Sequence, residues 1–435
     1  MLRVGWRLAG LWVVLVSVGW TPAWSASDET RLEGQVRLET LLAHALASNP
    51  WLRADVGLAG AAQERAAATG RLPEPELKLE SWAIPLRAPL AFDRAFMHMV
   101  GLRQTFPAFG SLDAQQSAAR EEEGQAADQV DMRKEDLVLE VRRAFATYKR
   151  LDKEYHLRLE HMGLASRLLE TMATAYRAGG GSIPDQLRLK VEMARISGDI
   201  ARAEQERRAA AATLNTLMNR DPDAELGPAF DRDPVIDEPV VDAFDQDAER
   251  DRPEVRSAMK EVRKNEYRLD AAQRQATWPT FMVGLDYMNM PMEQEHHGYG
   301  AMISVNLPWL NPARSANVRA GEQSRQSAIR FSEAARSQAR LEIRASLARW
   351  RAARERLILA DQSLIPLARQ SFELVQSQYA AGRGDISSVL DSFRGYLDGR
   401  LERVRAVADI EIATAERDRA AGGGRAFVAT VVGHH

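Results

Sequence analysis

Methionine and histidine side chains recur at close spacing in two short segments of this sequence. The residues are Met97, His98, Met99, Met288, Met290, Met292, His296 and His297. Soft thioether sulfurs suit soft monovalent cations such as Cu(I) and Ag(I). Methionine also fills irregular space in proteins, so this spacing alone assigns no metal ligand. Contact with a passing soft metal and a packing role therefore both stay open.

The residues that mark most enzymes are missing from the sequence. It has no cysteine, which excludes disulfides, thiolate metal sites and a cysteine nucleophile. It also has no glycine-rich phosphate loop, no Gly-x-Ser-x-Gly turn and no His-Glu-x-x-His motif. His44, His156 and His161 are isolated, and we expect them on the surface or in grooves. The sequence favours a protein that is not an enzyme, and it predicts no cofactor.

The bulk composition is that of a folded protein without a nucleic-acid partner. Hydrophobic residues make up 45% and charged residues 27%, which excludes a disordered chain. The net charge of -3 gives no basic field for nucleic acid. Acidic and basic residues are interleaved, as on solvated helix faces.

Residues 1–26 have the order of a secretory signal peptide. Two arginines precede an apolar run at 8–20, and the small residues Ala23, Ser25 and Ala26 follow. The run is shorter than the roughly 20 residues that a membrane-spanning helix needs. We therefore expect the mature chain to start near residue 26 and to work outside the cytoplasm.

The rest of the sequence repeats itself at a shift of about 203 residues. Four matches keep the same order: Asn49-Pro50 with Arg252-Pro253, Pro75 with Pro279, Phe106-Pro107 with Leu307-Pro308, and Tyr176-x-x-Gly179 with Tyr379-x-x-Gly382. Their nearly constant shift indicates duplication. We expect a first repeat at 27–219, a linker or equatorial segment at 220–251, a second repeat at 252–421 and a flexible tail at 422–435.

Each repeat predicts a helix, two strands and two longer helices. The expected helices span 50–72, 111–178, 183–219, 252–277, 313–380 and 386–420, and the expected strands span 75–84, 95–106, 279–290 and 298–307. Apolar or small residues at steps of three and four from Leu137 to Tyr176 form a coiled-coil seam. A helix over 111–178 would be roughly 100 Å long, which no ordinary globular core requires.

The expected strands have one apolar face and one polar or small face. Phe281, Val283, Leu285 and Tyr287 alternate with other side chains, although His98 interrupts the apolar face of its own strand. This alternation is typical of membrane β-barrel strands, and it also fits a sheet half-buried against helices. The opposite face, assigned to the barrel interior, collects Met97, Met99, Met282, Met288, Met290 and Met302.

The number of strands predicts how many chains assemble. Four strands cannot close a barrel with a lumen, whereas three chains that give twelve strands can. Backbone groups in lipid must all be hydrogen-bonded, so lipid-facing strands imply a homotrimer. The predicted fold is mainly α with a small β part, a trimeric 12-stranded β-barrel continued by a long α-helical coiled-coil barrel.

At this point the chain resembles the TolC-like outer membrane efflux family over nearly the whole mature sequence. The duplicated helix–hairpin–helix plan, the strand exits at Phe106-Pro107 and Leu307-Pro308 and the paired Tyr-x-x-Gly turns carry the resemblance. It implies a trimeric exit duct in the outer membrane with a periplasmic helical domain. It also implies docking onto a periplasmic adaptor (membrane fusion) protein and an inner-membrane pump of the RND type that supplies the energy.

The resemblance also places residues at the periplasmic constriction of the tunnel. In the second repeat the family's Tyr-x-x-Gly turn and a later acidic residue fall on Tyr379, Gly382 and Asp391, while another acidic position is occupied by Ser388. In the first repeat the equivalent acidic residue is Asp185. Three chains would gather at least six carboxylates into a ring that attracts cations and holds the tip closed.

An aspartate is also common at any helix start, so a purely structural role for these acids stays open. The remaining residues expected at the tips are Tyr176 at the constriction and Gly179, Gly181, Gly382 and Gly384 in the turns that contact the adaptor.

Two other functions remain open at this stage. One is a secreted or periplasmic coiled-coil spacer without transport, which would have no need of lipid-facing strands. The other is a duct for type I protein secretion. Among efflux ducts, the methionines favour the heavy-metal branch, which exports copper and silver or cobalt, zinc and cadmium.

Overall fold

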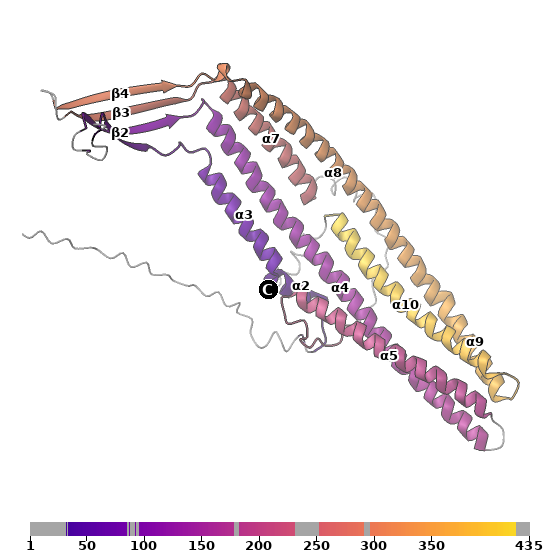
Figure 1. Cartoon of the computed structure of the whole chain (residues 1–435). Helices are drawn as coiled ribbons and strands as arrows, with labels where there is room; N and C mark the ends of the chain where they lie inside the picture. Colours follow the sequence, from indigo (N-terminus) through magenta and orange to yellow (C-terminus); the bar gives the residue numbers. More distant parts are fainter. Residues whose placement is uncertain are drawn as a thin grey trace, which may run out of the picture.

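The chain forms a long bundle of helices with a β-sheet at one end (Figure 1). The structure is a computed structural model of the 435-residue chain. It describes residues 34–84, 95–177, 182–230, 252–290 and 296–422, together with Leu32, Arg87 and Phe92. The expected signal peptide, the Gly179 to Gly181 turn, most of the linker and nearly all of the tail lie outside the described residues. No helix in the described part is long and apolar enough to cross a membrane.

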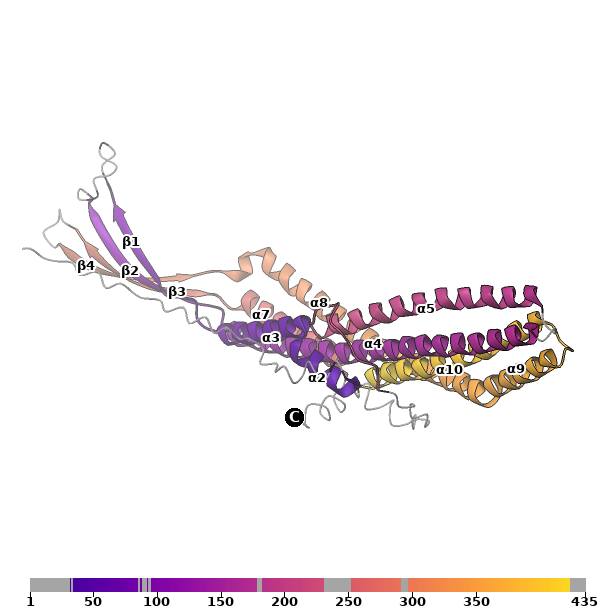
Figure 2. The ribbon, with the colours of Figure 1, turned by 90° about the horizontal axis from the view of Figure 1, so that it is seen from below.

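The helices follow the duplicated plan. In the first repeat they are α2 (Leu38–Ser48), α3 (Pro50–Ala68), α4 (Ser111–Arg177) and α5 (Ile183–Leu217). In the second they are α7 (Pro253–Thr277), α8 (Pro312–Leu359), α9 (Ile365–Ala380) and α10 (Ile386–Ala420), with short turns η3 (Pro308–Leu310) and η4 (Ala360–Leu364). Figure 2 shows α5 beside α4 and α9 beside α10, so each repeat ends in a helical hairpin.

An asparagine–proline pair starts one helix in each repeat, α3 in the first and α8 in the second. The Asn49 side chain accepts hydrogen bonds from the backbone N–H groups of Trp51 and Leu52, and Pro50 follows in the first turn of α3. Asn311 caps α8 in the same way by accepting from Ala313 N–H. A proline loses nothing there, because the first N–H groups of a helix have no partner within the helix.

The α8–α9 region differs from the single helix expected over 313–380. Five residues at Ala360–Leu364 form a π-helical turn, in which the Ile365 N–H donates to the Ala360 carbonyl. Pro366 has no N–H and its ring would clash with the carbonyl one turn earlier, so a regular α-helix cannot continue through this point. The corresponding helix of the first repeat, α4, runs unbroken for 67 residues.

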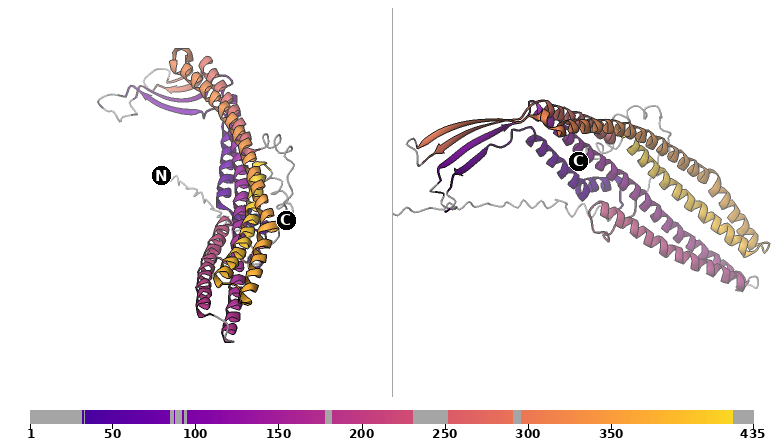
Figure 3. Two further views of the ribbon diagram at one scale, coloured as in Figure 1. Left: turned by 90° about the vertical axis from the view of Figure 1, so that its right-hand side faces the viewer. Right: turned by 45° about the horizontal axis from the view of Figure 1, so that its top comes forward.

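The sheet contains the strands β1 (Glu76–Trp82), β2 (Met97–Phe106), β3 (Phe281–Asn289) and β4 (His297–Val305). They are antiparallel neighbours in the order β1-β2-β3-β4, so the hairpins of the two repeats join into one sheet. Figure 3 shows this sheet projecting beyond the end of the helices, with no helix covering it.

One face of the sheet is apolar and exposed. Leu79, Leu285 and Ile303 lie on this face and are 70%, 67% and 72% exposed. His98, which interrupts the pattern, bonds to Ser81 Oγ through Nδ1 at 2.9 Å on the same face. A large exposed apolar surface marks contact with another apolar phase or a partner.

The main core lies where α2, α4 and α5 meet, at the level of the linker. Tyr148 on α4 is fully buried there and donates to the carbonyls of Leu226 and Gly227, at 3.1 and 2.9 Å. Val36 forms an isolated parallel bridge with Ala229. The start of the segment 220–251 is therefore anchored to the helices, and its residues 231–251 lie outside the described part.

Candidate functional site

The turn between α9 and α10 is fixed by its backbone. The Arg383 N–H donates to the Gln378 carbonyl and the Gly382 N–H to the Tyr379 carbonyl, both at 2.9 Å. This is a Schellman motif, which needs a left-handed residue after the helix, and Gly382 supplies it with φ +74°. Gly384 lies against the Tyr379 backbone, where a Cβ would be only 3.3 Å from the Tyr379 nitrogen.

The next helix starts with a side-chain cap. Asp385 accepts from the N–H groups of Ser387 and Ser388 at 2.6 and 3.2 Å, and the Ser388 hydroxyl donates to the second carboxylate oxygen at 2.9 Å. The Ser388 hydroxyl, followed by the two backbone N–H groups, lowers the pKa of Asp385. Ser388 thus occupies the place expected of an acid, and its role in this chain is to complete a helix cap.

The structure brings two of the predicted constriction residues together across the hairpins. The Tyr379 hydroxyl donates to Oδ2 of Asp185 at 3.2 Å, joining the end of α9 to the first turn of α5. Burial and the nearby Asp185 charge both raise the pKa of Tyr379. The tyrosine therefore stays protonated and keeps donating to the carboxylate at neutral pH.

A second, stronger link between the hairpins was not predicted from the sequence. Arg394 on α10 binds both carboxylate oxygens of Glu192 on α5, with Nε–Oε1 at 2.9 Å and Nη2–Oε2 at 2.5 Å. This hydrogen bonding lowers the pKa of Glu192 and raises that of Arg394. The predicted Asp391 instead points outward, its side chain 74% exposed, with Arg394 Nη1 at 3.4 Å.

His161 corrects the expectation that the isolated histidines lie on the surface or in grooves. It is 3% exposed, and its ring stacks on Phe393 with the centroids 3.6 Å apart. Burial and the Arg400 charge lower the pKa of His161 to about 4. His44 is also buried, so only His156 among the three has an exposed side chain.

The first tip is less complete than the second in the described residues. Tyr176 is 46% exposed near the end of α4, and Gly179 and Gly181 lie outside the described part. Arg188 on α5 donates to the Ser387 hydroxyl at 3.2 Å, which adds a further contact between the hairpins. Repeat matching identified the turns, but no periodicity in the sequence could pair Arg188 with Ser387 or Glu192 with Arg394.

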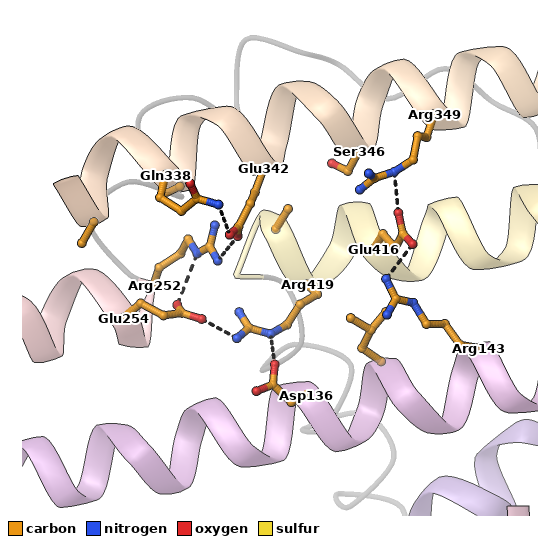
Figure 4. A pocket seen from close by; sticks show the side chains of 14 residues that line it. Asp136, Arg143, Arg252, Glu254, Gln338, Glu342, Ser346, Arg349, Glu416 and Arg419 are labelled. Carbon is orange, nitrogen blue, oxygen red and sulfur yellow. Dashed lines mark hydrogen bonds and ion pairs between the residues drawn. The ribbon is translucent and has the colours of Figure 1, made fainter. Parts of the chain in front are cut away.

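A charged pocket of about 520 Å³ lies where α4, α7, α8 and α10 meet (Figure 4). Its charged residues are Arg143, Arg252, Arg349, Arg419, Asp136, Glu254, Glu342 and Glu416. Because the four guanidinium groups face four carboxylates, the pocket has no excess charge with which to attract an ionic ligand.

The ion pairs of this pocket join all four helices. Arg252 is 3% exposed and donates to Glu254 and Glu342, at 3.3 and 2.6 Å. Arg419 bonds to Glu254 and donates to Asp136 at 2.9 Å. Burial opposes the charge on Arg419, but the bond to Glu254 and the nearby acids raise the pKa of Arg419 above its ordinary value. The pocket is a clamp between helices.

The strand pairing puts the predicted methionines on one face of the sheet. Met99 pairs with Met288, Thr105 with Met282, and Gly284 with Met302, and directly paired residues share a face. Lys78 and Glu80, which form an ion pair, lie on this face as well. Within the described residues, no three histidine, cysteine, aspartate or glutamate side chains are grouped so that they could hold a metal.

The fold defines the class of protein. The structure of CusC is similar with a TM-score of 0.77 and 16% identity, over 92% of this chain and 95% of that chain. The outer membrane protein VceC from Vibrio cholerae gives 0.74 and 15%, over 88% and 96%. The open state of the MtrE outer membrane channel from Neisseria gonorrhoeae gives 0.68 and 20%, over 89% of each chain. The chain therefore has the fold of outer-membrane channels.

The second repeat also matches a family model. The model of the outer membrane efflux protein family matches residues 245–423. No curated protein sequence matches the chain significantly. The second repeat thus matches the outer membrane efflux protein family, and the resemblance to TolC-like channels is confirmed.

Proposed function

We propose that this protein is the outer-membrane exit duct of a tripartite efflux system and works as a homotrimer. The observation that supports it is the uncovered sheet, whose apolar face is exposed and whose edge strands β1 and β4 have no further neighbour in the described chain. Three copies joined edge to edge would give twelve strands and satisfy these edges. The apolar face would then meet lipid, and the polar and methionine-bearing face would line the lumen.

The rest of the chain fits a conduit that does no chemistry. The helices would continue the barrel through the periplasm, and their tips would dock onto an adaptor protein. An inner-membrane pump, of the RND type, would supply the energy, since the efflux family consists of passive channels. The expected signal peptide would direct the chain across the inner membrane.

The helical tips are the proposed periplasmic constriction. Asp185 is held by Tyr379, whereas Asp391 is mostly exposed and lies beside Arg394. Three copies would bring these carboxylates together around one axis, where they would select cations. The links Tyr379–Asp185 and Arg394–Glu192 would keep the two hairpins of each chain packed in the closed state.

Cell fractionation tests the proposed duct against a spacer protein. We expect the protein in the outer membrane, soluble only in detergent, and migrating as a heat-sensitive trimer. A monomer that remains soluble without detergent would instead establish a periplasmic spacer, because exposed Leu285 and Ile303 would then face water in the functional state.

Monovalent copper or silver is the cargo that the sheet supports best. Six methionines share the proposed lumen face, and thioethers bind these cations in preference to hard ones. Deleting the gene should increase sensitivity to copper or silver in a strain without a second duct. Normal tolerance, with a defect in protein secretion, would favour the type I secretion duct.

A further inference from the structure

Four of the six methionines lie at the loop end of the sheet, where β2 begins and β3 ends. Figure 3 shows the sheet projecting away from the helices. Met99 and Met288 are directly paired. The next position outward on the same face is Met97 on β2 and Met290 after β3. The Met290 N–H donates to the His296 carbonyl at 2.8 Å, which places His296 beside Met290. Four thioethers and one imidazole therefore occupy two neighbouring rows.

The strand opposite these methionines provides space for them to converge. Cε of Met290 is 3.5 Å, and Cε of Met288 3.7 Å, from the point where a Cβ of Gly298 would lie. Cε of Met288 is also 3.4 Å from the equivalent point at Gly300. Both side chains thus lean over β4, and no side chain on these glycines keeps their sulfur atoms apart.

We propose that Met97, Met99, Met288, Met290 and His296 form a binding site for Cu(I) or Ag(I) at the outer mouth of the duct. Paired side chains in a sheet have Cβ atoms about 5 Å apart, so flexible thioethers from both rows can reach one cation. The position of the site in a lumen rests on the proposed function, whereas metal binding to the residues does not.

The other two methionines of this face provide the contrast. Met302 pairs with Gly284, and a Cβ at Gly284 would meet Arg103 Cγ at 3.2 Å and Met302 Cε at 3.4 Å, so the side chain of a cationic residue neighbours that thioether. Met282 pairs with Thr105 and Ser304, which offer hard oxygen donors. Glu80 on β1 pairs with Met99, but its carboxylate is engaged by Lys78 and by Trp82 Nε1. Four of the six thioethers of this face are therefore concentrated at the loop end.

The four methionines of the site are partly accessible, and His296 is exposed. A cation bound there can leave to the medium, as a duct requires. The site would bind weakly and transiently, because conduction needs contacts that also release the ion. Three chains would place three such sites around the mouth.

Silver titration of the purified trimer in detergent tests the site. The protein is labelled with ¹³C at the methionine methyl groups and titrated with Ag(I) nitrate in chloride-free buffer. We expect four methionine methyl signals to shift together, out of the 13 that remain once Met1 is removed with the signal peptide. The double variant Met288→Leu with Met290→Leu keeps side-chain volume and should weaken Ag(I) binding at least about tenfold.

The matched control is Met282→Leu with Met302→Leu on the same face, which should bind Ag(I) like the wild type. Equal Ag(I) affinity in all three proteins, or shifts confined to Met282 and Met302, would overturn the site. Planar-bilayer conductance of the same proteins separates the two proposals. A conducting trimer without Ag(I) binding refutes the site alone, whereas Ag(I) binding by a protein that forms no pore refutes the duct alone.

Discussion

The two helical hairpins come from one duplicated plan but differ in how they reach their tips. In the first hairpin α4 is a continuous helix of 67 residues. In the second, the equivalent helix is divided into α8 and α9 by the π-helical turn before Pro366. Asp361 in that turn accepts from Arg403 Nε on α10 at 2.7 Å. The two equivalent segments have similar lengths, but the second is interrupted by the turn before Pro366.

The contacts between the hairpins are polar at the tip and apolar behind it. Tyr379–Asp185 and Arg394–Glu192 bridge α9 and α10 to α5. Behind them, Phe393 and Phe372 pack with residues of α4 and α5 in one hydrophobic cluster. These contacts hold the continuous hairpin and the interrupted hairpin together.

The largest expected effect concerns the buried histidine behind the tip. Because the pKa of His161 is about 4 in the folded protein and 6.5 is its ordinary value, the unfolded chain takes up a proton first as the pH falls. The stability that the neutral, buried His161 contributes is fully present above pH 6.5 and is lost as the pH falls towards 4. The loss should reach about 3 kcal/mol at pH 4.

Thermal unfolding of wild type and His161→Phe against pH measures this loss. The variant keeps the ring stack on Phe393 and should lack this part of the pH dependence. His156→Phe, at an exposed position of the same helix, is the control and should follow the wild type. Identical pH profiles for all three proteins would show that His161 is not held neutral.

The second prediction tests the ion pair between Arg394 and Glu192, which joins the two hairpins. Arg394→Ala leaves the Glu192 carboxylate, 6% exposed, without its bidentate partner. We expect a loss of about 2 kcal/mol in stability, below the cost for a fully buried pair because Arg394 is half-exposed. Arg195→Ala removes an exposed arginine 3.5 Å from the same carboxylate and should cost much less. Equal losses would mean that the link does not couple the hairpins.

The third prediction concerns the proposed constriction. Asp185→Ala with Asp391→Ala should raise single-channel conductance in planar bilayers and reduce cation selectivity, because the ring of carboxylates is removed. Tyr379→Phe should give a smaller rise, since it removes only the hydrogen bond to Asp185. Unchanged conductance and selectivity in the double variant would place the constriction elsewhere.

The smallest expected effect concerns the π-helical turn between α8 and α9. Pro366→Ala restores a backbone N–H and should let α8 and α9 join into one α-helix, with a stability change of about 1 kcal/mol or less. Spin labels at exposed positions 341 and 374 can report the distance between the two segments, because the chain has no cysteine to interfere. Pro184→Ala, in the first turn of α5, is the control and should leave that helix unchanged.

Much of this molecule follows from local patterns in the sequence. Alternation at Phe281, Val283 and Leu285 identified a strand with one apolar face, and heptad spacing after Leu137 identified the long helix. Turn glycines and helix-starting prolines depend on their own backbone geometry, so Gly382 could be located without any partner. Pro366 was also visible, but the apolar spacing around it concealed the break in the helix.

Tertiary structure alone decided which side chains meet. Glu192 and Arg394 are 202 residues apart, and each resembles many other charged residues on solvated helix faces. The burial of His161 and the outward position of Asp391 depend on how α5 and α10 pack, which periodicity within one helix does not specify. Local patterns determine the elements because they depend on near neighbours, whereas contacts between elements depend on distances that only the folded chain sets.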